Sequence, residues 1–242
     1  MESVIAVWGK NGAGKSTVAV AIGTELAKND WLVGIIVADT AYASAQHLLG
    51  IEIPQGRGLG GALKNPYDEA AKYFVESPRT RNLFLLALSE KDNCFTVNGV
   101  GEDEAKRLLL TTKERFDCII VDCTASIKDS MTFIGLSYST MIIDILQANI
   151  TDYKFRLSHQ PFLDEFRLRE KVVYVINGDR GYFDIRLAEK GLKTKFSYIL
   201  PYSETVFEAE NNGEILSPDN IRSKKDKQYL KTINSLVSEV MG

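Results

Sequence analysis

The sequence has 242 residues, of which 45% are hydrophobic and 25% are charged, and its formal net charge is −3 at pH 7. That length suits one sizeable α/β domain, which we expect to span residues 1–242, and it is long enough to bury a hydrophobic core. The charge balance gives no overall basic field of the kind that indicates nucleic-acid binding.

The three cysteines, Cys94, Cys118 and Cys123, are an odd number without C-x-x-C spacing. This number and spacing argue against a disulfide framework and against a zinc ribbon. No apolar run approaches the roughly 20 residues that span a bilayer, and the first strand leaves no room for a signal peptide. We therefore expect a reducing, cytoplasmic setting.

The first informative stretch is 9–17. It lies between an apolar run at 4–8, which is typical of a buried strand, and a predicted helix at 18–27. It fits G-x-x-x-x-G-K-[ST] without a mismatch. Glycines let backbone N–H groups curl around a phosphate, and the helix that starts near Gly14 points its positive end at the same anion. Lys15 can reach the β- and γ-phosphates, and the Ser16 hydroxyl can ligate Mg²⁺. The loop therefore predicts binding of a nucleoside triphosphate by Gly9, Asn11, Gly12, Ala13, Gly14, Lys15, Ser16 and Thr17.

A second buried strand is predicted at 32–38, and it ends in Asp39. Open α/β sheets bind ligands at such strand ends, but Asp39 is equally suited to cap a helix around 43–49. The glycine-rich stretch 56–61 lacks a lysine and a preceding strand, so we expect a plain surface turn. Periodicity then predicts a helix at 67–75, a strand at 82–88, a surface connection at 89–101 and an amphipathic helix at 102–115.

The next run, 116–122, has four apolar residues that end in Asp122, which is the Walker B pattern. Together with the upstream loop, this pattern predicts that Asp122 holds Mg²⁺ close to Ser16. The alternative is an aspartate that only forms a turn.

Later strands are predicted at 141–146, which carries Asp144 near its middle, at 171–176 and at 196–200. A helix at 151–170 is expected to be interrupted near Pro161. Asn177 ends the strand at 171–176, where its amide can read a purine edge or form a turn before Gly178. The tail from 221 predicts a helix with one apolar stripe, packed on the sheet rather than lying on a membrane.

Strands alternate with helices along the whole chain. This alternation predicts an α/β fold with a mostly parallel, twisted sheet and helices on both faces, the three-layer arrangement of P-loop NTPases. His47 and His159 have no partners at metal-ligand spacing, so we assign them no chemistry.

The loop also contains Lys10, five positions before Lys15, and the resulting G-K-x-G-x-G-K-S-T resembles the deviant Walker A motif of the MinD/ParA ATPases. The resemblance covers nearly the whole chain. It implies that Lys10 crosses a nucleotide-sandwich dimer to contact the partner's phosphates, and that Asp39 orients the attacking water. It also implies that Asp122 is the Walker B aspartate and that Asn177 reads adenine. Pro201 and Tyr202, followed by a helix in 206–213, match the family's adenine loop.

The chain departs from the family pattern at three places. Asn11 replaces a common glycine, which we explain by the tolerance of asparagine for positive φ. Val37 stands where many members carry another aspartate, so Mg²⁺ would depend more on Ser16 and Asp122. The segment 122–126 lacks the family's proline and glycine, which puts the speed of hydrolysis in question.

The resemblance implies an ATP hydrolase, slow and stimulated by a partner, with ATP/ADP and Mg²⁺ as cofactors and Lys10, Lys15 and Asp39 as catalytic residues. It implies a nucleotide-dependent homodimer that positions or recruits an assembly through a further protein partner. The assembly could be a pilus (a TadZ-like role), a secretion system, a flagellum, a septum or a DNA segment. DNA contact, membrane contact and peripheral recruitment to a membrane or cell pole are left open. The alternatives are a nucleotide-gated scaffold with negligible hydrolysis, a metallocentre-insertion ATPase, and an ATP-dependent ligase of the dethiobiotin type.

Overall fold

The computed structural model describes residues 3–42, 44–89, 91–92 and 100–242. Its strands are β1 (Ser3–Gly9), β2 (Val33–Val37), β3 (Val75–Glu76), β4 (Leu83–Leu86), β5 (Cys118–Asp122), β6 (Met141–Gln147), β7 (Val172–Asp179) and β8 (Tyr198–Pro201). Its α-helices are α1 (Lys15–Lys28), α2 (Ala45–Leu49), α3 (Gly58–Lys64), α4 (Glu102–Lys113), α5 (Ser130–Tyr138), α6 (Ile150–Glu165), α7 (Ile185–Leu192), α8 (Glu204–Asn211) and α9 (Lys224–Met241). Short 3₁₀ turns lie at Ala70–Tyr73, Arg169–Lys171 and Pro218–Asn220.

The strands form one sheet in the order β3-β4-β2-β5-β1-β6-β7-β8. All paired strands are parallel except β3, which pairs antiparallel with β4 at the edge. The predicted fold class is therefore confirmed. The chain first builds the sheet on one side of β1 and then, from β6 onward, on the other side, so the carboxyl end of β1 lies where doubly wound sheets bind ligands.

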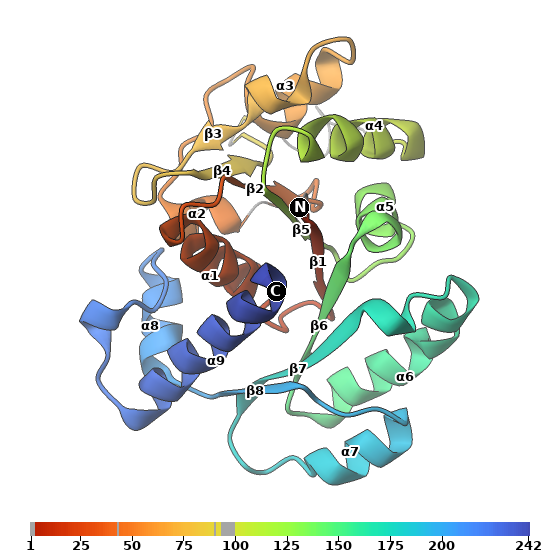
Figure 1. Ribbon diagram of the computed structural model, residues 1–242, viewed down its shortest axis with the longest axis vertical. Helices are drawn as coiled ribbons and strands as arrows, with labels where there is room; N and C mark the ends of the chain where they lie inside the picture. The colour runs from red at the N-terminus through yellow and green to blue at the C-terminus, as the bar shows by residue number, and fades with distance from the viewer. Residues whose placement is uncertain (1–2, 43, 90, 93–99) are drawn as a thin grey trace.

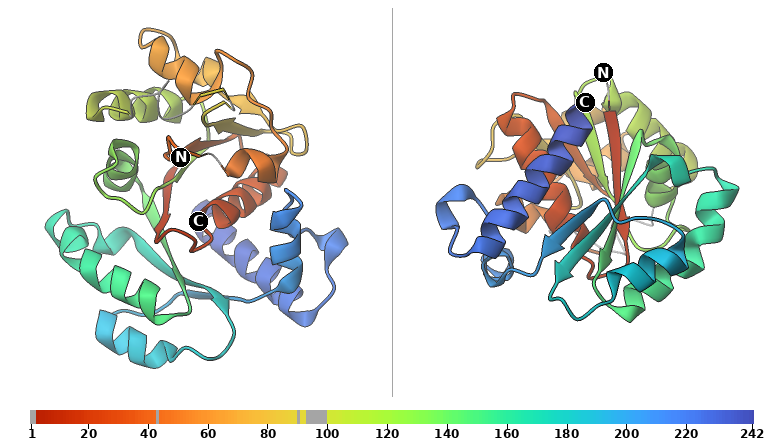
Figure 2. Two further views of the ribbon diagram at one scale, coloured as in Figure 1. Left: turned by 180° about the vertical axis from the view of Figure 1, so that it is seen from behind. Right: turned by 60° about the horizontal axis from the view of Figure 1, so that its bottom comes forward.

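Helices cover both faces of the sheet. Figure 1 shows α1 and α9 on one face and α4, α5 and α6 on the other, and the second view of Figure 2 shows α9 and α6 on opposite sides of the strands. Two buried clusters correspond to these faces, one around Ile22, Leu26 and Ile233 and one around Trp8 and Leu108. Because both faces of the central strands are covered, those strands are near-continuous runs of apolar residues.

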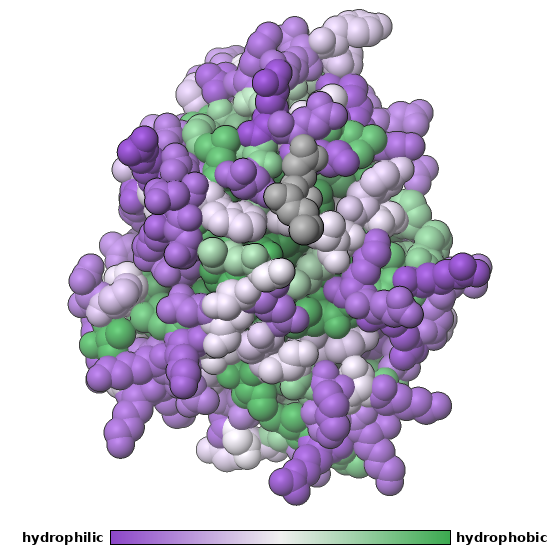
Figure 3. Space-filling model, in the orientation of Figure 1, coloured by the Kyte–Doolittle hydropathy of each residue, from purple (hydrophilic) through white to green (hydrophobic). Residues whose placement is uncertain are grey.

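The C-terminal helix α9 packs on the sheet as predicted. Tyr229, Ile233, Leu236 and Val237 are buried in the cluster that contains α1, and Lys224 to Lys227 are exposed apart from Asp226. Figure 3 shows hydrophilic residues around the edge of the face that it presents. Among the described residues, no helix has the length and apolarity required to cross a membrane.

Several predicted elements differ from the structure. The stretch 67–75 is not a helix: only Ala70–Tyr73 turns, as 3₁₀, and Val75 begins the edge strand β3. The stretch 56–61 is not a plain turn, because Gly58–Lys64 forms the buried helix α3. A Cβ on Gly61 would lie 2.2 Å from the carbonyl oxygen of Gly56, so the glycine permits a close approach that the sequence pattern does not reveal.

Helix α6 runs without a break through Pro161, contrary to the predicted interruption. The helix is held on both sides of the proline by the buried side chains of Arg156 and Leu163. Arg156 pairs with Asp144 and donates to the Tyr174 hydroxyl at 2.7 Å, which explains the aspartate in the middle of an apolar strand. Cys118 and Cys123 are buried. Cys94 and most of the predicted connection at 89–101 lie outside the described residues.

Candidate functional site

The loop between β1 and α1 has the backbone that its glycines predict. Gly9, Gly12 and Gly14 have φ of 150°, 78° and 91°, so side chains there would be strained. A Cβ on Gly9 would lie 2.2 Å from the carbonyl oxygen of Ile145. Asn11 does not adopt a positive φ, so our explanation of the asparagine at that position was wrong.

The two lysines of the loop are held differently. Lys15 curls back over the loop and donates from Nζ to the Lys10 carbonyl at 3.1 Å. Burial lowers the pKa of Lys15 below its usual range, although Asp122 and other nearby acidic groups oppose this shift. A lysine in this position is already oriented over the concave face of the loop, where a phosphate would lie.

Lys10 points away from the loop and meets a residue that the sequence pattern did not single out. Its Nζ lies 3.5 Å from Asp152 Oδ1, and the side chains of the two residues are 35% and 1% exposed. Asp152 Oδ2 accepts the Gln147 backbone N–H at 3.0 Å, and Gln147 Nε2 donates to the Gly12 carbonyl at 2.6 Å. The end of β6 and the start of α6 thus each contact the loop, over sequence separations that no local pattern reveals.

Ser16 and Asp122 meet as predicted. The Ser16 hydroxyl donates to Asp122 Oδ2 at 2.6 Å and accepts from the Ser44 hydroxyl at 3.0 Å. Asp122 Oδ1 is buried without a hydrogen-bond partner, and burial raises the pKa of Asp122 to about 6. An unpaired buried carboxylate oxygen beside a serine hydroxyl suits a hard cation such as Mg²⁺.

Within the described ranges, no group of three or more His, Cys, Asp or Glu side chains could hold a metal by itself. Mg²⁺ commonly takes only one or two carboxylates and completes its shell with water and substrate phosphates. Ser16 and Asp122 therefore fit a magnesium ion that is bound together with a nucleotide.

Asp39 lies at the end of the second predicted strand, half-buried. Its Oδ1 accepts the backbone N–H groups of Ala41 at 2.8 Å and Tyr42 at 3.2 Å. The N-cap of α2 is Ser44, so the reading of Asp39 as a helix cap was wrong. The side chain instead fixes the turn that leads away from the strand end, next to the loop.

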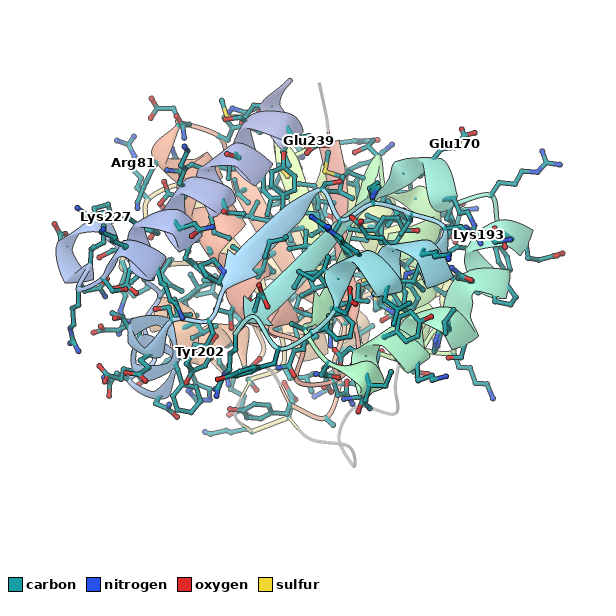
Figure 4. All side chains as sticks on the ribbon, turned by 90° about the horizontal axis from the view of Figure 1, so that it is seen from below. Arg81, Glu170, Lys193, Tyr202, Lys227 and Glu239 are labelled. Atoms are coloured by element: carbon teal, nitrogen blue, oxygen red, sulfur yellow. The ribbon has the colours of Figure 1, made fainter. Side chains whose placement is uncertain are left out.

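Asn177 and Tyr202 line one cavity of about 420 Å³ at the carboxyl ends of β6, β7 and β8. Asn177 Nδ2 donates to the Ala13 carbonyl at 2.8 Å, which connects this cavity to the phosphate loop. Pro201 ends β8 just before Tyr202. Figure 4 shows Tyr202 at the end of the sheet opposite to Glu170 and Glu239.

A second cavity, of about 670 Å³, opens on the other side of the start of α1. It is lined by Ser16, Thr17, Ser44, His47 and Glu210 among others, and the Thr17 hydroxyl donates to Glu210 Oε1 at 2.5 Å. Glu210 is a further residue at the loop that sequence reasoning missed, since 193 positions separate it from Thr17.

The segment after Asp122 is fixed by its own hydroxyl groups. Thr132 Oγ1 accepts the Thr124 backbone N–H at 2.9 Å, and Thr124 Oγ1 accepts the Ser126 N–H at 3.2 Å. Hydrogen bonds to threonine therefore shape this stretch in place of the proline and glycine of the family pattern.

The parallel sheet, the glycine loop at the end of β1 and the serine–aspartate pair define a P-loop protein. No family model matches the chain. A curated relative, the septum site-determining protein MinD of Synechocystis sp., is 31% identical over 127 residues, which are 52% of this chain and 46% of that protein. The match thus spans less than half the length of the relative.

Several solved structures have the same fold over nearly the whole chain. The ParA family ATPase from Chlorobium tepidum has a TM-score of 0.81 with 16% identity, over 98% of both chains. MinD from Pyrococcus horikoshii, complexed with Mg-ADP, has a TM-score of 0.80 with 15% identity, over 99% of this chain and 97% of that one. MinD in the MinC:MinD cell division complex of Aquifex aeolicus has a TM-score of 0.78 with 20% identity, over 98% and 96%. The sequence match over half of the chain is to a MinD protein, and the fold is that of the MinD and ParA-family P-loop structures.

Proposed function

We propose that this protein is a Mg·ATP-dependent ATPase that dimerises around nucleotide and acts as a switch to position or recruit a partner assembly. The observation that carries the proposal is the presence of two differently held lysines in one loop. Lys15 lies over the loop, and Lys10 extends to its rim, where it contacts only Asp152 among the charged groups of the described chain.

Lys15 and the backbone N–H groups from Gly12 to Thr17 would hold the triphosphate. The start of α1 adds its positive end, and its N-cap is Gly14, so no side chain covers the free N–H groups. The positive φ at Gly12 and Gly14 fixes the curl of this loop.

Ser16 and Asp122 would hold Mg²⁺, which when bound neutralises charge that develops on the phosphates. Ser44 supports Ser16 through its hydroxyl. A magnesium complex with ADP in the Pyrococcus MinD structure supports the same cofactors here.

Asp39 would orient the attacking water. Its Oδ1 is engaged by two backbone N–H groups, which fix the carboxylate and leave Oδ2 as the atom that could accept a hydrogen bond from water. Lys10, delivered from a second copy of the chain, would stabilise the charge on the γ-phosphate, a role for which a cation contributes about 10³–10⁵ in rate in related phosphoryl-transfer enzymes.

The cellular task would be positioning, with a further protein as partner and activator. The support is the similarity to MinD over half of the chain and the MinC:MinD complex among the similar structures. A metallocentre-insertion role has less support, because the two described cysteines are both buried.

The test is single-turnover hydrolysis of Mg·ATP by the wild-type chain and by Lys10→Ala. We expect the wild type to hydrolyse ATP slowly and the variant to be at least about tenfold slower, because the variant lacks the cation that acts across the dimer. Lys195→Ala is the matched control, since Lys195 is highly exposed and pairs with Glu189 away from the loop.

Equal and negligible rates in wild type and Lys10→Ala, with ATP bound by both, would refute hydrolysis and favour the nucleotide-gated scaffold. One observation favours that second function: hydrogen bonds to Thr124 and Thr132 already fix the segment that moves in a hydrolysing switch. Absence of ATP binding by the wild type would refute both functions.

A further inference from the structure

The cavity of about 420 Å³ at the ends of β6, β7 and β8 contains a cation that the family motif does not account for. Arg180 lies three residues after Asn177, and its guanidinium carbon is 3.7 Å from the centre of the Tyr202 ring. Tyr182 and Phe207 also line the cavity. No salt bridge engages Arg180 in the ranges that the structure describes, and its exposed guanidinium lies on the Tyr202 ring.

The backbone holds Arg180 in this place. The pairing of β7 with β8 is irregular between Ile176 and Asp179, and Asp179 pairs with Pro201. The Asp179 carbonyl accepts the Tyr202 N–H at 2.9 Å, and Asp179 Oδ1 accepts the Gly181 N–H at 2.8 Å. These two bonds bracket Arg180, so the stacking of its side chain on Tyr202 follows from an ordered turn.

Two residues that line the cavity also contact the loop that would hold the phosphates. Asn177 donates to the Ala13 carbonyl, and Gln147 donates to the Gly12 carbonyl. Both amide nitrogens are thus committed to the loop, and Gln147 Oε1 accepts from Asn149 Nδ2 at 3.1 Å, so these side chains form a fixed wall between the cavity and the loop.

We propose that Arg180, backed by the Tyr202 ring, is the surface on which the base of the nucleotide stacks. A guanidinium is planar, weakly hydrated and well suited to lie between two π systems, so one face can rest on Tyr202 and the other can receive a purine. This inference rests on the proposed nucleotide binding and adds to it a residue that holds the base by stacking.

Stacking and simple charge attraction make different predictions, because they depend on different properties of the side chain. A stacked base needs a flat surface, whereas attraction to the phosphates needs only a positive charge. Arg180→Lys keeps the charge without the plane, and Arg180→Trp keeps a plane without the charge. Arg180 is exposed, so none of these substitutions should disturb the core.

The experiment is calorimetric titration of the full chain with Mg·ATP. We expect Arg180→Ala and Arg180→Lys each to weaken binding by about 10- to 100-fold, since alanine substitution of a stacking side chain has an effect of this size. Arg180→Trp should stay close to wild type. The matched control is Arg186→Ala, which removes an exposed arginine from α7 and should bind as wild type does.

Two results would overturn the inference while leaving the proposed function intact: wild-type affinity in Arg180→Ala, or affinity restored by lysine and not by tryptophan. Absence of ATP binding in the wild type would overturn the proposed function and this inference together. Melting temperatures of the variants, which we expect to match the wild type, separate a local effect from unfolding.

Discussion

The residue type that a position of the loop requires depends on its contacts as well as on its backbone conformation. Gly12 and Gly14 both have positive φ, but their surroundings differ. A Cβ on Gly14 would lie 2.3 Å from Asn177 Nδ2, whereas a Cβ on Gly12 would have no atom within 4 Å. The hydrogen bond between Asn177 and Ala13 therefore exists only because position 14 has no side chain.

This pair of glycines gives a matched prediction. Gly12→Ala should lower the free energy of unfolding by about 1–2 kcal/mol, the cost of a positive φ for an L-residue. Gly14→Ala should lower it by about 1–3 kcal/mol more, because it also displaces Asn177 from its partner. Urea unfolding without nucleotide measures the free energy of unfolding of both variants. Equal losses would show that the contact of position 14 with Asn177 does not contribute.

Much of the site could be predicted at this scale, because a phosphate loop is a contiguous pattern with a physical meaning. Asp152 and Glu210 could not, since each reaches the loop from a distant element. Nothing in their immediate sequence distinguishes them from ordinary acidic residues near a helix end.

Elements are anchored to the sheet by polar networks as well as by apolar faces. Asp226, in the first turn of α9, is 1% exposed. It accepts hydrogen bonds from the hydroxyls of Ser203 at 2.6 Å and Thr205 at 3.0 Å, and from the backbone N–H groups of Arg222 and Ser223, both at 2.8 Å. One carboxylate thereby joins the start of α8 to the start of α9.

Asp226→Asn should lower the free energy of unfolding at neutral pH by about 2–4 kcal/mol, because an amide nitrogen would face hydrogen-bond donors. Burial alone would raise the pKa of Asp226, but these hydrogen bonds outweigh it and hold the pKa well below its usual range. The stabilisation is therefore complete above the unfolded pKa of about 3.9 and is lost as the pH falls below it.

Chemical unfolding at several pH values tests this. The difference between wild type and Asp226→Asn should shrink as the pH falls below about 4, while Asp219→Asn, at an exposed position, should change stability by less than about 0.5 kcal/mol throughout. A difference that does not change with pH would mean that the charge of Asp226 has no part in the network.

Among the elements, the buried strands could be predicted because central parallel strands are unbroken apolar runs, as at Cys118–Asp122. Helices α3 and α5 could not be predicted, because neither has a clear apolar stripe along one face. Helix α3 is built on glycines, and α5 is apolar on nearly all sides. Pro161 gave the opposite error: it predicted an interruption, but α6 continues past it because tertiary contacts hold the helix.

At the scale of the whole molecule, the fold brings every proposed functional group to the carboxyl end of the sheet. Ser16, Asp39, Asp122 and Asn177 each follow or end a strand, and parallel strands place those ends together. Lys10, directly after β1, lies at the same end, and its partly exposed side chain pairs with the buried Asp152. The proposed dimer assigns a function to this lysine, because a second copy facing the same end of the sheet would receive it.

The measurement that tests this account most directly is the molar mass of the chain in solution by light scattering, with Mg²⁺ and a non-hydrolysable ATP analogue. We predict the mass of two chains with the analogue, of one chain with ADP, and of one chain for Lys10→Ala under both conditions. A chain that binds the analogue and stays a monomer would contradict the account.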